Sequence, residues 1–291
     1  MTIFYILFAL MIIAGLVFVF HLSQIHQNPK IPHKTTPAKY EIPFQEIRFT
    51  TKNGCQLYGW WMPCRNKTSN SVPTLILVHG WGRNLESMMP YIKELHLNGY
   101  NLLAFDSRNH GNSDSDKHSN MLKFAEDIHE AVTFVEKQVE VDPNRIGVIG
   151  LSMGGGALIY AAAHDTRIKS AITVGAFAHP VDHLRWDFKK KHIPYFPLVW
   201  LTAKFIQFQV GVSIDQIAPV NNIQDAIAKF LLIHGEKDAV VPVEQGEKLK
   251  NAGNPETVQL WVVPEKGHSN CYDHPEFWNK VQSFLQKSLS A

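Results

Sequence analysis

Short apolar runs alternate with longer amphipathic stretches along most of the chain. The apolar runs predict strands at residues 46–51, 56–62, 74–78, 101–105, 145–149, 171–174, 230–233 and 258–263. Helical periodicity marks residues 86–97, 122–139, 153–163 and 276–289. Because the inner runs are almost continuously apolar, as in strands buried on both faces, we predict an α/β fold. Its mostly parallel central sheet has about eight strands, with helices on both faces.

One interval breaks this alternation. Residues 178–229 separate two strands that a single helix would join, and we interpret them as a helical lid insertion. Seven of the twenty-three residues from 186 to 208 are aromatic: Trp186, Phe188, Tyr195, Phe196, Trp200, Phe205 and Phe208. This density fits an apolar acyl pocket, and it fits equally a lid helix that buries one face against its own domain.

The first twenty-two residues have a different pattern. Residues 3–22 contain no Asp, Glu, Lys or Arg, and as a helix they would span about 30 Å, the thickness of a bilayer core. No Lys or Arg precedes this run and no A-x-A-like site follows it, which favours a transmembrane anchor at residues 1–22 over a cleaved signal peptide. Three lysines follow the span, so we expect a single-pass protein with a cytoplasmic catalytic domain. Residues 23–43, with four prolines, predict a linker, and residues 44–291 the catalytic domain.

Charge and cysteine content narrow the classes of partner. The net charge is +2, but three lysines lie before Glu41, which leaves 25 basic and 26 acidic residues in the rest of the chain. This balance argues against nucleic acid as a partner. The three cysteines, Cys55, Cys64 and Cys271, have neither the pairing nor the spacing of a zinc site or a disulfide framework. No metal or organic cofactor is implied, and the oligomeric state is left open.

The sequence Gly150-Leu151-Ser152-Met153-Gly154 fits the pattern G-x-S-x-G. It follows an apolar strand and opens a helix of small residues, which is the strand-turn-helix context of a nucleophilic serine. A buried serine in a glycine-rich turn would show the same five residues, but the strand before it and the helix after it favour Ser152 as a nucleophile on a strained turn.

A serine nucleophile requires a base and an oriented carboxylate. His268 follows the last predicted strand and Asp238 the strand before it, so the chain order is Ser, Asp, His. Acyl transfer also requires N–H donors for the developing oxyanion. We predict these donors to be the backbone N–H groups of Met153 and Trp81.

Taken together, these motifs resemble the α/β-hydrolase superfamily over about residues 45–289. They occur in the order His79-Gly80-Trp81-Gly82, then residues 106–113, then the motif around Ser152, then the Asp238 and His268 loops. Residues 106–113 are similar to a D-x-R-x-H-G-x-S loop, which implies loop-holding hydrogen bonds for Asp106, Arg108 and His110. Residues 54–60 and the Val-Pro after Asp238 are similar to the dienelactone-hydrolase-like and prolyl-oligopeptidase-like branch.

The resemblance implies a serine hydrolase that cleaves carboxylic esters through an acyl-enzyme intermediate, and the aromatic residues of the insertion favour lipophilic acyl groups. The substrate would be a small-molecule or lipid ester, with the N-terminal helix in the membrane. Thioesterase, lipase and peptidase activities use the same triad, and the sequence does not choose among them. A non-catalytic, membrane-anchored binding module is the alternative of a different class, but the complete set of motifs favours an enzyme.

Overall fold

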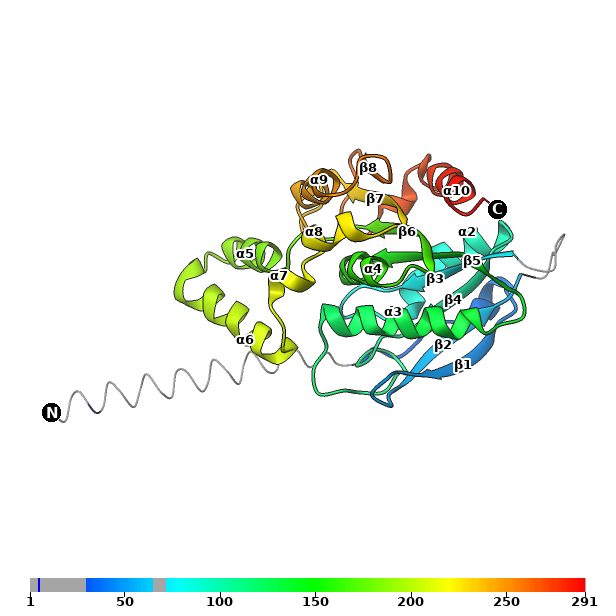
Figure 1. Cartoon of the computed structure of the whole chain (residues 1–291), viewed down its shortest axis with the longest axis horizontal. Coiled ribbons are helices and arrows are strands. Elements are labelled where there is room, and N and C mark those ends of the chain that lie inside the picture. Colours follow the sequence, from blue (N-terminus) through cyan, green and yellow to red (C-terminus); the bar gives the residue numbers. More distant parts are fainter. Residues whose placement is uncertain (1–4, 6–29, 65–71, 291) are drawn as a thin grey trace.

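The computed structural model describes Tyr5, residues 30–64 and residues 72–290 (Figure 1). Eight strands form one sheet in the order β1-β2-β4-β3-β5-β6-β7-β8. They are β1 Gln45–Thr50, β2 Gln56–Met62, β3 Val72–Val78, β4 Asn101–Phe105, β5 Val141–Leu151, β6 Ile168–Val174, β7 Lys229–Gly235 and β8 Val258–Val263. Strand β2 is antiparallel to both of its neighbours, β1 and β4, and the six strands from β3 to β8 are mutually parallel. The predicted mostly parallel sheet of about eight strands is confirmed.

Helices cover both faces of this sheet. In β3, Ile76 and Val78 join the core cluster that contains residues of α3 and α4, while Leu75 and Leu77 join the cluster with residues of α2 and α10. This alternation shows that a parallel strand is buried on both sides. The covering helices are α2 Met89–Leu97, α3 Met121–Glu136, α4 Met153–His164, α9 Val243–Ala252 and α10 Phe277–Ser288. Of these, α9 is missing from the sequence-based prediction.

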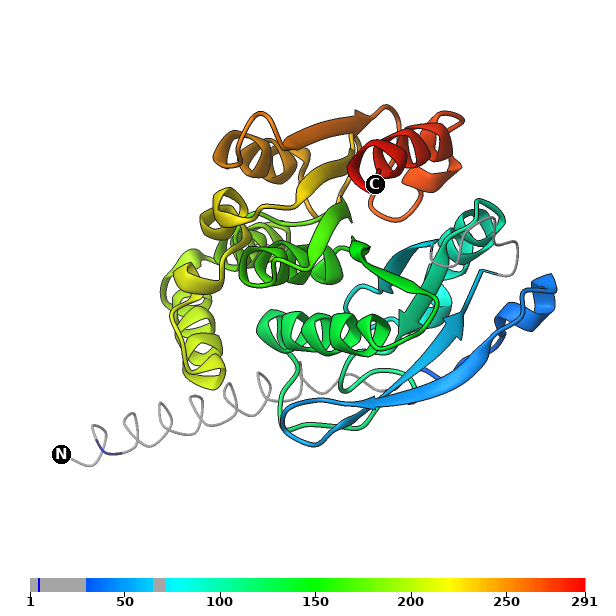
Figure 2. The same cartoon turned by 45° about the vertical axis from the view of Figure 1, so that its right-hand side comes forward.

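The interval between β6 and β7 is helical, and α5 and α6 lie beyond one end of the sheet in both views (Figure 1 and Figure 2). Its elements are α5 Pro180–Lys190, the π-helical turn η3 Tyr195–Val199, α6 Trp200–Val210, α7 Ile214–Ile217, α8 Pro219–Asn222 and the 3-10 turn η4 Ile223–Asp225. None of the residues of α5 is fully buried. Four of the seven aromatic side chains singled out above are exposed: Tyr195, Phe196, Trp200 and Phe208. Most of this aromatic surface therefore does not pack into the core of the domain.

The described part of the predicted linker packs against the domain. The 3-10 turn η1 spans Pro37–Tyr40. His33 stacks on Tyr58, with ring centroids 5.4 Å apart, and its Nε2 lies 2.9 Å from Asp106 Oδ2. Asn84 Nδ2 donates to Ile31 O at 3.0 Å. Residues 31–33 are thus held on the catalytic domain, whereas the predicted domain boundaries stay a prediction.

Two predictions about the membrane are corrected. No helix in the described part of the chain is long and apolar enough to cross a bilayer. The longest one described in full, α3, has 16 residues, which extend about 24 Å, and it carries charged side chains such as Lys123 and Asp127. On this finding the transmembrane helix in the predicted fold class is wrong, as is the single-pass membrane localisation, and the predicted membrane partner is not supported. The predicted span, residues 1–22, lies outside the described residues apart from Tyr5.

The loop after β4 is held by hydrogen bonds to backbone groups. The two carboxylate oxygens of Asp106 accept from the N–H groups of Leu85 and Asn112, both at 2.8 Å. His110 Nε2 accepts from the N–H of Gly82 at 3.2 Å. Both side chains are buried, so these bonds also satisfy polar atoms that water does not reach. This is the structural role that the motif resemblance implies.

The buried pair Arg108–Asp127 joins this loop to α3 and gives a test of stability. Arg108 Nε lies 2.7 Å from Asp127 Oδ1, and both side chains are almost fully buried. Arg108→Ala is expected to lower the free energy of unfolding by about 3–5 kcal/mol, because it leaves a buried carboxylate without its cation. Urea unfolding monitored by circular dichroism measures the difference.

Lys191→Ala is the matched control for the loss of a cation. It removes a pair with Asp187 whose two side chains are both exposed, so the expected loss is only about 0–1 kcal/mol. Equal losses in the two variants would contradict a structural role for the Arg108–Asp127 pair.

Candidate active site

Ser152 lies on the turn between β5 and α4 in a strained backbone conformation, with φ 52° and ψ −113°. Glycines make this turn possible. A Cβ at Gly150 would lie 2.4 Å from Gly154 O, and a Cβ at Gly154 would lie 2.6 Å from His79 O. Strand and helix therefore approach too closely for side chains at these two positions, and Ser152 is held at the carboxyl end of the sheet. This is the turn that the G-x-S-x-G pattern predicts.

Asp238 follows β7 and His268 follows β8, and the two side chains meet. His268 Nδ1 lies 2.7 Å from Asp238 Oδ2, and Asp238 Oδ1 accepts from the N–H groups of Val240 and Val241, both at 2.8 Å. The Asp238 carboxylate is buried, while the His268 ring is 17% exposed. Since an ionised carboxylate only accepts, Nδ1 of His268 carries the hydrogen and Nε2 is left as the basic nitrogen.

His234 lies beside this pair and holds the Asp238 loop. Its Nε2 donates to Val241 O at 2.8 Å and lies 3.5 Å from Asp238 Oδ2. Burial lowers the pKa of His234, partly offset by its hydrogen bond to Val241. A neutral His234 therefore fixes the Asp238 loop without placing a positive charge beside the carboxylate.

Gly175, which the sequence analysis does not single out, connects the serine to the Asp238–His268 pair. Ser152 N donates to Val174 O at 2.8 Å, and the next residue, Gly175, has φ 65°. A Cβ at Gly175 would lie 2.9 Å from His268 Nδ1 and 3.4 Å from Asp238 Oδ2. In the described part of the chain no hydrogen bond joins the Ser152 hydroxyl to His268. The two residues are linked instead through Val174, which binds Ser152 N, and Gly175, which packs against His268. The only sequence signal is a glycine directly after an apolar strand.

The two predicted oxyanion donors belong to segments that lie next to Ser152. Met153 is the first residue of α4, where a backbone N–H has no acceptor within the helix. Trp81 follows Gly80, and a Cβ at Gly80 would lie 3.4 Å from Ser152 Cβ. The loop that carries Trp81 therefore lies against the serine.

A buried histidine fixes that loop. His79 Nδ1 donates to Gly80 O at 2.7 Å and Nε2 accepts from Ser107 N–H at 3.0 Å, which requires the neutral ring. Burial, reinforced by the neighbouring His110, lowers the pKa of His79 to about 4. The neutral form is thus the stable one near pH 7, and both hydrogen bonds persist there.

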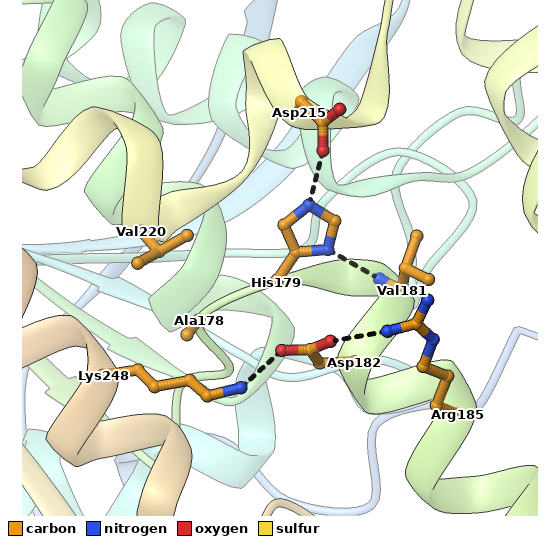
Figure 3. A pocket seen from close by; sticks show the side chains of 8 residues that line it. All are labelled: Ala178, His179, Val181, Asp182, Arg185, Asp215, Val220 and Lys248. Carbon is orange, nitrogen blue, oxygen red and sulfur yellow. Dashed lines mark hydrogen bonds and ion pairs between the residues drawn. The ribbon is translucent and has the colours of Figure 1, made fainter.

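A cavity of about 350 Å³ lies at the root of the helical insertion (Figure 3). None of the five predicted site residues lines it. Its polar side chains bind one another: His179 Nε2 lies 2.9 Å from Asp215 Oδ1, and Lys248 Nζ lies 2.6 Å from Asp182 Oδ2. The cavity is therefore separate from the residues around Ser152.

The described residues contain no metal site, and the buried Cys271 is not a reactive thiol. Across residues 30–64 and 72–290, no group of three or more His, Cys, Asp or Glu side chains is arranged to hold a metal ion. Cys55 and Cys271 are free thiols. Burial raises the pKa of the Cys271 thiol to about 12, so it is protonated and unreactive near neutral pH.

Comparisons with known proteins point to one family. A family model described as the alpha/beta hydrolase fold matches residues 73–202. The chain is 26% identical over 263 residues to the uncharacterized protein YfhR of Salmonella typhimurium, covering 88% of this chain and 85% of the relative. It is 33% identical over 142 residues to the thiohydrolase aneE of Aspergillus aculeatus, covering 48% of this chain and 43% of the relative.

Among solved structures, the esterase Pf2001 of Pyrococcus furiosus is similar with a TM-score of 0.70 and 25% sequence identity, covering 90% of this chain and 99% of that one. The family model gives the α/β-hydrolase fold, and the similar solved structure is a hydrolase. This chain has the α/β-hydrolase fold and is a hydrolase.

Proposed function

We propose that this hydrolase is a serine esterase that cleaves carboxylic esters of lipophilic acyl groups through an acyl-enzyme intermediate. Ser152 Oγ attacks the ester carbonyl carbon while His268 Nε2 takes the hydroxyl proton. The C–O bond to the alcohol then breaks, and His268 returns the proton to the leaving alcohol. Water, deprotonated by His268, next attacks the acyl-enzyme. The bond between the acyl carbon and Ser152 Oγ breaks, His268 returns the proton to Oγ, and the acid is released.

The observation that carries this proposal is the 2.7 Å contact between His268 Nδ1 and Asp238 Oδ2. Two backbone N–H groups hold the other carboxylate oxygen, so Asp238 fixes both the tautomer and the orientation of His268. The carboxylate also stabilises the imidazolium that forms when His268 takes the serine proton. Gly175 supports the proposal further, because it brings this pair against the strand end that binds Ser152 N.

The N–H groups of Met153 and Trp81 are the proposed oxyanion donors. Both belong to segments in contact with Ser152, and Met153 opens α4, whose dipole favours negative charge at that end. Donors that are fixed before the reaction lower the barrier without reorganising during it. This arrangement favours catalysis over a binding module, for which such donors have no use.

Lipophilic acyl groups are supported by the exposed aromatic side chains of the insertion. Tyr195, Phe196, Trp200 and Phe208 offer apolar surface that the core of the domain does not cover. Burying an acyl chain against such surface is favourable by about 0.8 kcal/mol per methylene. The similar structure from Pyrococcus furiosus is named an esterase, which agrees with an ester substrate.

Thioester hydrolysis is the second candidate. The thiohydrolase aneE is 33% identical to this chain over 142 residues, a higher identity than that of YfhR, which matches over a longer stretch. The same nucleophile, base and oxyanion donors serve a thioester, since a thiolate leaves more readily than an alkoxide. Parallel rates on an oxygen ester and a sulfur ester of the same acid separate the two candidates.

The first prediction from the proposed function concerns the nucleophile. A fluorophosphonate probe is expected to label the protein covalently at Ser152, and Ser152→Ala is expected to abolish labelling and esterase activity. Ser170→Ala is the matched control, because this buried hydroxyl binds Ser288 at 2.7 Å and lies outside the site. Gel fluorescence and peptide mass spectrometry locate the adduct. Folded wild-type protein that resists the probe would overturn the proposed function.

The second prediction concerns Gly175. A methyl group at Gly175→Ala would stand 2.9 Å from the His268 ring, so we expect kcat on 4-nitrophenyl butanoate to fall about 100-fold or more through misplacement of the base. Gly99→Ala is the control, since Gly99 also has a positive φ, 84°, but nothing within 4 Å of its Cβ position. Equal kcat in the two variants would show that Gly175 does not position His268.

The third prediction concerns the acyl group. Across 4-nitrophenyl esters from ethanoate to dodecanoate, kcat/KM is expected to rise by at most about fourfold per added methylene, the equivalent of 0.8 kcal/mol, until the apolar surface is filled. Phe196→Ser is expected to flatten the rise, whereas Leu97→Ser, an exposed residue of α2, leaves it unchanged. A flat profile in the wild type would refute the lipophilic preference alone.

A further inference from the structure

Helix α5 carries two buried polar atoms without a hydrogen-bond partner among the described residues. They are Nδ1 of His183 and Nε1 of Trp186. Residues three apart are neighbouring positions on one side of a helix. A buried polar atom without a partner is costly and uncommon in a native protein. Other such atoms, among them Ser107 Oγ and Ser119 Oγ, lie outside the insertion. The two on α5 are of interest because this helix lies next to the candidate site.

The position of α5 relates these atoms to the catalytic residues. The His183 ring stacks on Phe177 with centroids 5.7 Å apart and planes 13° apart. Phe177 is two residues beyond Gly175, whose Cα packs against His268 and Asp238. At the other end of α5, Lys190 Nζ donates to Ala239 O, next to Asp238, at 2.6 Å. The helix is thus anchored beside the Asp238–His268 pair at both ends.

The chemistry of the two rings restricts the missing partner. Burial lowers the pKa of His183; Asp187 opposes this and His268 adds to it, so the ring is neutral near pH 7. A neutral imidazole Nδ1 donates or accepts according to its tautomer, whereas an indole Nε1 only donates. A hydroxyl group satisfies both, because its hydrogen can bind His183 and its oxygen can accept from Trp186. A methyl group of the same size satisfies neither.

We propose that His183 and Trp186 are specificity-determining residues that bind a hydroxyl group on the acyl or the alcohol part of the ester. The proposal rests on the proposed function of the same site and names its substrate class, hydroxylated esters. The exposed aromatic side chains and these two polar atoms then bind different parts of the substrate. The aromatic side chains contact its apolar chain, and His183 and Trp186 of α5 bind its hydroxyl group.

The test compares esters that differ only by a hydroxyl in place of a methyl group. The pairs are the 4-nitrophenyl esters of 3-hydroxybutanoic and 3-methylbutanoic acid, those of 2-hydroxybutanoic and 2-methylbutanoic acid, and the alcohol pair 2-hydroxyethyl and propyl butanoate. We expect kcat/KM to favour the hydroxyl compound by about tenfold or more in at least one pair, because a site built for a hydroxyl leaves its own atoms unpaired on the methyl analogue.

Two variants remove the polar atoms and keep the rings. His183→Phe retains the stack on Phe177, and Trp186→Phe retains an aromatic ring without the N–H. Each is expected to bring the hydroxyl-to-methyl ratio to within about threefold of unity by loss on the hydroxyl ester alone. His183→Gln keeps an amide that can bind a hydroxyl and is expected to restore part of the preference.

His164→Phe is the matched control. His164 also stacks on an aromatic ring, Tyr160, at 4.2 Å, but its Nδ1 is bonded to Tyr160 O and it lies at the end of α4. It is expected to leave the ratio unchanged. Equal rates on the two members of every pair, in wild-type protein that the fluorophosphonate labels, would overturn this inference and leave the proposed function standing. A preference that survives in both phenylalanine variants would overturn it too, whereas failure of the probe would refute the proposed function itself.

Discussion

The site depends on a close backbone contact at the carboxyl end of the sheet, where β3, β5 and β6 meet α4. Gly150 and Gly154 leave no room for side chains between strand and helix, and the backbone oxygens of Val78 and His79 pack directly onto Gly154. Gly175 continues the same contact to His268. Without these approaches the loops after three different strands would stand further apart, and Ser152 would not lie against the loop of Trp81.

Two buried carboxylates, Asp106 and Asp238, use the same hydrogen-bonding chemistry for different purposes: the first is structural and the second is proposed to be catalytic. Burial raises the pKa of Asp106, but hydrogen bonds from His33 and Asn112 and the nearby His79 outweigh it, so the pKa lies below the ordinary value. The hydrogen bonds of Asp106 therefore fix loops and the segment around His33 on the domain. Asp238 uses one oxygen in the same way, on two backbone N–H groups, and keeps the other for His268. Asp238 therefore differs from Asp106 in that its partner, His268, is proposed to use its other ring nitrogen in the reaction.

The helical insertion combines two kinds of group that the fold itself does not use. Aromatic side chains remain exposed on η3 and α6, and two polar ring atoms on α5 are buried without partners in the described chain. Buried polar atoms without partners also occur elsewhere, such as Ser107 Oγ and Ser119 Oγ, but the insertion combines them with exposed aromatic side chains. A substrate with an apolar chain and one hydroxyl would satisfy both, which would tie the insertion to the proposed catalytic residues.

The sequence by itself determined the alternation of strands and helices, the turn at Ser152 and the strand ends that carry Asp238 and His268, because periodicity, glycines and chain order are local signals. It could not predict α9, in which only Gln245, Gly246 and Leu249 are buried, so that its apolar stripe is too narrow to stand out. Nor could it predict the His33–Asp106 contact, Gly175 as the link to His268, or the unpartnered atoms of His183 and Trp186. Hydropathy alone also led to the transmembrane helix, which the described helices do not support. Only the tertiary structure decided the contacts of His33 and Gly175 and the burial of the two atoms of α5, because these depend on residues far apart in the sequence, which leave no local pattern.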